Sequence, residues 1–230
     1  MIKSFLIIIS FSTLLFSSQQ VILVVADDFN TSKAKLECFE DGKILFKKID
    51  VNLGKNGLGW GLGEIDIQEN SQEVKKYEGD KKAPIGIFKL TNIFGYAKKS
   101  NFKLPYLHTS KSLICVDDSN SNFYNHIIET DGNQKSYEHM KRSDNQYKLG
   151  ITVAHNEEGK AKRGSCIFLH VEKYAGAPTA GCTSMRYSDI QKIAKWLDKK
   201  KNPILIQIPK SSSDRILKLY PQLQSSQLLH

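Results

Sequence analysis

His170 and Cys182 are the side chains of this sequence best suited to covalent chemistry. A thiol beside an imidazole can ionise, and the thiolate is the reactive nucleophile. Cys182 follows a turn-rich run of small residues, 174–181, in which Gly181 can direct successive backbone N–H groups at one point. Such a turn suits an oxyanion hole, the donors that stabilise the negative oxygen of an acyl-transfer intermediate. Taken alone, the pair is also explained by a core cysteine and a hydrogen-bonded histidine.

A predicted strand positions the histidine. Residues 165–171 (SCIFLHV) are strongly strand-like and place His170 near the end of that strand. With the strand period of two, Cys166 and Phe168 share a face with His170. One helix is predicted shortly after Cys182, over residues 188–200.

This helix has a start signal and an apolar face. Ser188 and Gln191 form a potential capping box, and Asn202-Pro203 ends the helix. The apolar stripe consists of Ile190, Ile193, Ala194 and Leu197.

The rest of the pattern is mainly β. Asp41-Gly42 is a hairpin turn signal, and residues 119–144 are polar, which indicates loops and a short helix. No internal linker is visible, so we expect one domain over residues 19–209, followed by a polar tail at 210–230. Further strands are predicted at residues 21–25, 35–40, 43–51, 85–90, 113–116, 147–154 and 204–208.

Glycine is dense in residues 54–63 (GKNGLGWGLG). This density indicates tight turns or a close approach of backbone, around a ligand or another segment. The run lacks the ending of a phosphate-binding loop. Trp60 lies within it, either lining a sugar or peptide groove or acting as a hydrophobic plug.

Composition and charge limit the class of protein. The chain has 230 residues, of which 40% are hydrophobic and 25% charged, so it should fold as a globular protein. Its net charge of +9 favours an anionic partner, which could be nucleic acid, acidic lipid or an anionic cell-wall polymer. The basic residues Lys98, Lys99, Lys141 and Arg142 are expected on a solvated face.

The N-terminus predicts export. Residues 1–18 are similar to a signal peptide, with Lys3 before an apolar run at 5–16 that is short for a membrane span. Cleavage after Ser18 is favoured over cleavage after Ala26, because the residues between them resemble a strand. An uncleaved membrane anchor is the alternative. Export makes nucleic acid a poor explanation of the charge and predicts a periplasmic or cell-wall location.

Four cysteines stand at positions 38, 115, 166 and 182, with no CxxC pair. An exported chain can form two disulfides, but the spacing does not require them. We expect Cys166 to be a buried structural thiol, and Cys38 and Cys115 to be core residues or a disulfide. A metal site using Cys166, His170 and Cys182 is disfavoured because no further ligand lies nearby in sequence. The histidines at 108, 126, 139 and 155 have ordinary surface or loop explanations.

His170 followed by Thr179-x-Gly181-Cys182 resembles the signature of the L,D-transpeptidase (YkuD-like) catalytic domain. Other segments resemble one branch of that family, in order along nearly the whole chain. They are residues 56–61 (NGLGWG), 78–80 (EGD), 83–88 (APIGIF), 94–96 (FGY), 115–118 (CVDD), 124–125 (YN), 136–140 (SYEHM) and 164–170 (GSCIFLH).

The resemblance implies a mainly β fold with a few helices, a sandwich or open barrel that acts on peptidoglycan stem peptides without metal or organic cofactor. Cys182 would attack the carbonyl of an L-centre residue bonded to a terminal D-amino acid, with His170 as the base. The Val171 carbonyl would orient His170, and N–H groups near Gly181 and Cys182 would hold the oxyanion. Candidate substrate-binding residues are Thr179, Trp60 and His139.

One position departs from the family pattern. Ser184 stands where many members have arginine, and Arg186 follows two residues later. An arginine would help to bind an anionic stem peptide, so this chain must use another group. The departure leaves donor specificity and the choice of reaction open, but the nucleophile and base do not depend on it. Transpeptidation is the leading hypothesis. The alternatives are an L,D-carboxypeptidase on the same scaffold and a non-catalytic peptidoglycan-binding protein.

Overall fold

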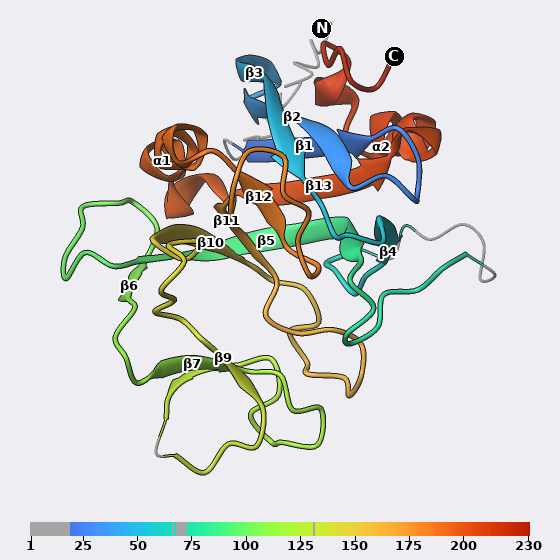
Figure 1. Ribbon diagram of the computed structural model, residues 1–230. Coiled ribbons are helices and arrows are strands. Elements are labelled where there is room, and N and C mark those ends of the chain that lie inside the picture. The colour runs from blue at the N-terminus through green and yellow to red at the C-terminus, as the bar shows by residue number, and fades with distance from the viewer. Residues whose placement is uncertain (1–18, 66, 68–72, 131) are drawn as a thin grey trace, which may run out of the picture.

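The computed structural model describes residues 19–65, 67, 73–130 and 132–230. The predicted signal peptide, residues 1–18, lies outside the described residues. The fold is mainly β, as predicted, with few and short helices (Figure 1). The strands are β1 (Gln20–Ala26), β2 (Lys33–Glu40), β3 (Lys43–Asn52), β4 (Leu58–Trp60), β5 (Ala83–Gly95), β6 (Tyr106–His108), β7 (Leu113–Val116), β8 (Ile127–Glu129), β9 (Tyr137–His139), β10 (Leu149–Val153), β11 (Phe168–Val171), β12 (Thr183–Met185) and β13 (Ile204–Pro209).

The large sheet closes on itself. Its strand order is β10-β11-β12-β3-β2-β1-β13-β5-β4, and β10 also pairs with β5. The pairings of β1 with β13, β4 and β6 with β5, and β11 with β12 are parallel. The other pairings are antiparallel. Closure removes most free strand edges. The pairing of β12 with β3 places β12, and β11 beyond it, on the side of the β2–β3 hairpin.

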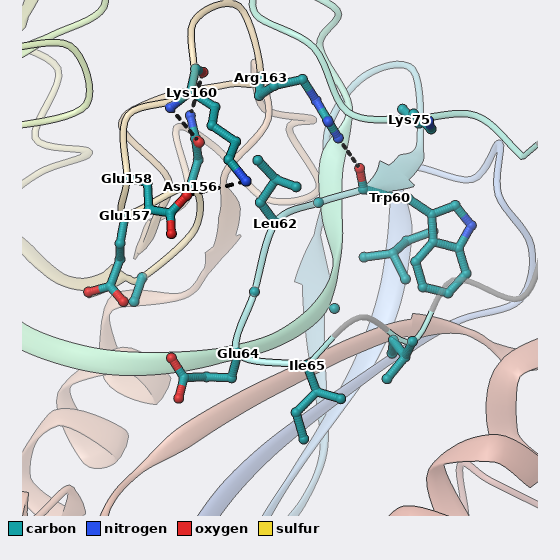
Figure 2. Close-up of a pocket in the computed structure, with 16 residues that line it drawn as sticks. Trp60, Leu62, Glu64, Ile65, Lys75, Asn156, Glu157, Glu158, Lys160 and Arg163 are labelled. Carbon is teal, nitrogen blue, oxygen red and sulfur yellow. Dashed lines mark hydrogen bonds and ion pairs between the residues drawn. The ribbon is translucent and has the colours of Figure 1, made fainter. Parts of the chain in front are cut away.

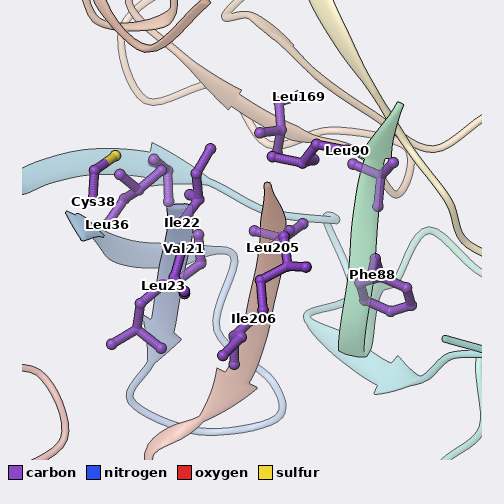
Figure 3. Close-up of a cluster of buried hydrophobic side chains, with 14 of the residues drawn as sticks. Val21, Ile22, Leu23, Leu36, Cys38, Phe88, Leu90, Leu169, Leu205 and Ile206 are labelled. Carbon is purple, nitrogen blue, oxygen red and sulfur yellow. The ribbon is translucent and has the colours of Figure 1, made fainter. Parts of the chain in front are cut away.

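The main hydrophobic core forms around β1. Every residue of β1 is buried, because its continuous apolar run is covered on both faces. Leu205 and Ile206 of β13 lie next to β1, and Phe88 of β5 lies on the far side of β13 in the same core (Figure 3). Cys38 of β2 lies in this core as a free thiol, in agreement with the expected core position.

The β2–β3 hairpin has its turn where the sequence predicts it. Asp41 and Gly42 have φ angles of 51° and 77°. Two successive left-handed residues match the twist of the flanking strands, which is why Asp-Gly is favoured there.

The long helix is shorter than predicted. Helix α1 spans Tyr187–Trp196, and a 3-10 turn follows at Lys199–Lys201. The predicted capping box is wrong: Arg186 is the N-cap, and no side chain caps the helix. The apolar stripe is confirmed, since its four residues are all buried.

Residues 210–230, predicted as a polar tail, are folded. They form helix α2 (Ser213–Leu219) between 3-10 turns at Lys210–Ser212 and Pro221–Leu223. Ile216, Leu223 and Leu229 are buried in the main core. The sequence did not predict this, because most residues of the segment are polar and its few buried apolar residues are far apart.

A second, three-stranded sheet has the order β8-β7-β9 and lies apart from the large sheet (Figure 1). Two of its strands come from residues 119–144, where the sequence predicted loops and a short helix. Three-residue strands are too short to show a period. A second apolar cluster joins this small sheet to β5 and β11, and its members are Phe94, Leu113, Cys115, Met140, Tyr147, Cys166, Phe168 and Cys182.

Strand β11 begins later than predicted. Cys166 has a φ of 55°, a left-handed conformation that a strand excludes. Its predicted place on the strand face of Phe168 and His170 is therefore wrong.

The glycine-rich run brings backbone close to backbone. A Cβ at Gly54 would lie 2.3 Å from the Lys81 oxygen, and one at Gly63 would lie 2.2 Å from the Ile87 oxygen. The predicted close approach is confirmed, and at these two positions the neighbour is the protein's own chain.

Candidate active site

His170 lies near the end of β11 and is buried. Its Nδ1 is 2.8 Å from the Val171 carbonyl oxygen, the contact that the family resemblance implied. Because a carbonyl can only accept, Nδ1 carries the proton and Nε2 is left to accept one. Burial lowers the pKa of His170 to about 4, although the Val171 bond opposes this. The imidazole is therefore neutral at pH 7 and available as a base.

Cys182 is buried on the turn that leads into β12. Its Sγ accepts a hydrogen bond from the Phe168 amide at 3.3 Å, and its thiol donates to the Cys166 carbonyl at 3.4 Å. Burial, and secondly the charge of Glu138, raise the pKa of Cys182 to about 12. The resting pair is thus a neutral thiol and a neutral imidazole, and the thiol must lose its proton as it attacks.

Tyr147 links the two candidate catalytic residues. Its ring packs edge-on against His170 with centroids 5.4 Å apart, and it shares the second apolar cluster with Cys182. Its hydroxyl donates to Glu138 at 2.5 Å. Burial raises the pKa of Tyr147 well above its usual value, so the hydroxyl stays protonated. Sequence reasoning missed Tyr147 and Glu138, because neither stands beside His170 or Cys182 in the chain.

Arg142 is one of the positive charges near the candidate nucleophile. Its guanidinium lies over the Tyr147 ring at 5.2 Å and forms two hydrogen bonds to Asp144, at 3.0 and 2.6 Å. Its charge lowers the pKa of both Cys182 and His170. Its side chain is 36% exposed, so the predicted solvated face holds only in part, since Arg142 also packs on Tyr147.

Ser184, which replaces the family arginine, faces a different set of groups. It is buried in β12, and its Oγ accepts from Asn52 at 3.4 Å. Arg186 is largely exposed and pairs with Asp189 at 2.8 Å. Of these basic groups, Arg142 is the one that acts electrostatically on Cys182.

Thr179 holds the turn before the nucleophile. Its hydroxyl donates to the Cys182 carbonyl at 2.6 Å and accepts the Gly181 amide at 3.0 Å. Gly181 has a φ of 150°, and a Cβ there would lie 3.0 Å from the Lys82 oxygen, so a larger residue would displace the turn. The Gly181 amide, predicted as an oxyanion donor, is thus engaged with Thr179, while among the described residues the Cys182 amide has no acceptor.

A buried lysine lies behind the same turn. Lys76 donates to Asp80 and to the Tyr77 carbonyl, each at 2.6 Å, and its side chain is only 3% exposed. Its Nζ is 3.7 Å from where a Gly181 Cβ would lie, and its charge lowers the pKa of Cys182. Asp80 belongs to a segment that the sequence singled out, but nothing in the pattern indicated Lys76.

Cys115 and Cys166 form a disulfide. The expected free structural thiol at Cys166 is therefore wrong, and a metal site that includes it is excluded by the bond. The disulfide fastens β7 of the small sheet to the residue whose carbonyl contacts Cys182. Within the described part of the chain, no group of three or more histidine, cysteine or acidic residues could hold a metal ion.

The predicted substrate-binding residues Trp60 and His139 lie on different parts of the fold. Trp60 is buried in the main core and lines a cavity of about 500 Å³, whose other lining residues include Glu64, Asn156 and Arg163 (Figure 2). Neither His170 nor Cys182 lines this cavity. His139 is exposed on β9, with its ring 5.1 Å from that of Tyr137.

His155 differs from its predicted surface or loop role. It is 1% exposed, its Nδ1 accepts the Leu62 amide at 3.2 Å, and its Nε2 is 3.0 Å from the Arg163 carbonyl. Burial lowers its pKa to about 4. These contacts make it a structural histidine of the core.

In the described residues, no helix has the length and apolar character needed to cross a membrane.

A buried thiol directly before β12 and a neutral imidazole on the paired strand β11 are typical of enzymes that use a cysteine nucleophile with a histidine base. The family comparison makes the class specific. The model of the YkuD L,D-transpeptidase catalytic domain matches residues 21–206, and the chain belongs to this family. It is thus an enzyme of a family that acts on peptidoglycan. Neither the curated proteins nor the solved structures yielded a match to the chain.

Proposed function

We propose that this chain is an exported L,D-transpeptidase that cross-links peptidoglycan stem peptides through a thioester on Cys182. The observation that carries the proposal is the His170 tautomer. Its Nδ1 proton is committed to the Val171 carbonyl, so its Nε2 is free to take the thiol proton.

The proposed reaction has two halves. Cys182 attacks the carbonyl of the L-centre residue while His170 takes its proton, and the same proton then goes to the leaving D-amino acid. The Cys182 amide is the candidate donor to the oxyanion, on the turn that Thr179 holds. An amine of a second stem then attacks the thioester, forms the new amide and releases Cys182.

The burial of Cys182 supports attack coupled to proton transfer. A thiol whose pKa is about 12 holds a negligible fraction of thiolate at neutral pH. Substrate must therefore approach before the proton moves, which protects the thiol from unspecific reagents. Because the thiol is protonated at rest, the proposed reaction requires His170 to take its proton.

The test is mass spectrometry of defined tetrapeptide and pentapeptide muropeptides incubated with the protein. Wild type, Cys182→Ala and the control Cys38→Ala are compared. We expect cross-linked dimers that lack the terminal D-residue with wild type and Cys38→Ala, and none with Cys182→Ala.

The other outcomes identify the alternatives. Trimmed monomers without dimers would establish an L,D-carboxypeptidase, in which water resolves the thioester. Unchanged muropeptides with folded protein would favour a non-catalytic peptidoglycan-binding role. Export is tested separately, by the N-terminal sequence of protein recovered from the periplasm or cell wall.

A further inference from the structure

The small sheet places a carboxylate beside the candidate nucleophile. Glu138 of β9 stands opposite Cys115 of β7 in the antiparallel register. Cys115 is bonded to Cys166, and the Cys166 carbonyl accepts the Cys182 thiol at 3.4 Å. Directly opposite residues of paired strands share a face, so Glu138 lies on the face that packs toward Cys182.

The carboxylate works against the nucleophile in the resting enzyme. Its negative charge disfavours the thiolate and helps to raise the pKa of Cys182. The other groups that act on Glu138 are Tyr147, Arg142, Asp117 and Glu78. Arg142 is the only cation among them, and two hydrogen bonds commit it to Asp144. A cation that arrived with substrate would remove this cost.

One carboxylate oxygen is fixed and the other is open. The Tyr147 hydroxyl holds Oε2 at 2.5 Å, while Oε1 has no hydrogen-bond partner in the described part of the chain. Glu138 is partly exposed, and β9 is an edge strand of the small sheet. Burial raises the pKa of Glu138, which makes the carboxylate a stronger base than an ordinary surface glutamate.

We infer that Glu138 binds the ammonium group of the acceptor stem peptide and takes its proton before the amine attacks the Cys182 thioester. This inference rests on the proposed function and concerns its second half. The ammonium gives one proton to Glu138, and the neutral amine forms a C–N bond to the thioester carbonyl as the C–S bond breaks. The second amine proton passes through His170 to the departing sulfur. Glu138 then releases its proton to solvent.

The experiment separates acylation from aminolysis. The protein, with its Cys115–Cys166 disulfide intact and Cys182 reduced, is acylated on Cys182 with a tetrapeptide donor. The ratio of aminolysis to hydrolysis of this acyl-enzyme is then measured with two nucleophiles. One is a diamino-acid stem peptide, which is an ammonium ion at neutral pH. The other is hydroxylamine, which is largely unprotonated there. Wild type is compared with Glu138→Gln and with the control Glu129→Gln. Glu129 belongs to β8, at the opposite edge of the small sheet, and accepts hydrogen bonds from Ser110 and Ser112.

For Glu138→Gln we expect the ratio with the stem peptide to fall about tenfold or more, the value of a lost charged hydrogen bond. The ratio with hydroxylamine should not change. Alkylation of Cys182 by iodoacetamide should become faster, because the opposing charge is gone. Glu129→Gln should match wild type in every measurement.

Two results would overturn the inference while leaving the proposed function intact. One is an unchanged ratio with the stem peptide, and the other is an equal fall with both nucleophiles, which indicates a merely structural glutamate. If Glu138→Gln does not fold, Tyr147→Phe keeps the carboxylate but frees Oε2, and it must then retain preference for the ammonium acceptor. A wild type that forms no acyl-enzyme would overturn the proposed function and this inference together.

Discussion

Loss of the Cys115–Cys166 disulfide should both destabilise the protein and loosen its candidate site. The bond joins two segments 51 residues apart, and it is the covalent link between the small sheet and the residue that contacts Cys182. A cross-link stabilises mainly by restricting the unfolded chain, and its effect grows with the length of the closed loop. The perturbation is Cys115→Ala combined with Cys166→Ala.

The loop length sets the magnitude. For a separation of 51 residues, the chain-entropy relation gives a loss of about 4 kcal/mol in the free energy of unfolding at 25 °C. Measured losses for native disulfides span about 2–5 kcal/mol. Since small domains have total stabilities of about 5–15 kcal/mol, the loss is large enough to measure directly.

The assay is urea denaturation with and without reductant. Wild type should lose stability when reduced, while the double variant should start lower and not respond to reductant. Cys38→Ala is the matched control: it removes a buried thiol without removing a cross-link, and it should keep the response to reductant. Alkylation of Cys182 should be faster in the double variant, because Cys166 no longer holds its carbonyl in place. A loss below about 1 kcal/mol, or a wild type indifferent to reductant, would refute this reasoning.

Three further predictions concern single residues near the site. Thr179→Val removes both hydrogen bonds of the hydroxyl, so it should lower the free energy of unfolding, measured in urea, by about 1–3 kcal/mol and abolish most of the turnover. Thr179→Ser keeps the hydroxyl and should retain both stability and turnover. Equal behaviour of the two variants would contradict this role. Lys76→Met leaves the Asp80 carboxylate without its cation, which should lower the free energy of unfolding by about 3 kcal/mol. It should also slow alkylation of Cys182, because the lysine charge lowers the pKa of that thiol. Faster alkylation would show that the lysine charge does not favour the thiolate. His155 and His170 are held neutral, with pKa values of about 4 in the folded protein against 6.5 in the unfolded chain. The stability present above pH 6.5 should therefore be lost as the pH falls toward 4, by up to about 3 kcal/mol for each histidine. His155→Gln should lose less stability than wild type between pH 7 and 5, and an identical loss would exclude His155 as a contributor.

Structural features that depend on residues close together in the chain could be predicted from the sequence. The apolar run of β1, the Asp41-Gly42 turn and the buried stripe of α1 all follow from local periodicity and turn chemistry. The capping box is wrong, because Ser188 lies two residues after the true N-cap, Arg186, and is already inside the helix. The short strands β8 and β9 were not predicted, because three residues cannot show an alternation of apolar and polar side chains.

The sequence by itself determined the candidate nucleophile and base, the family, and a mainly β fold, because each depends on residue type and short spacing. Tertiary structure alone decided what surrounds Cys182. Glu138, Tyr147 and Arg142 reach the site from the segment around the small sheet, which a disulfide fastens to Cys166. Electrostatic energy and burial depend on distance in space, so a carboxylate far from Cys182 along the chain can act on its pKa once the fold brings them together.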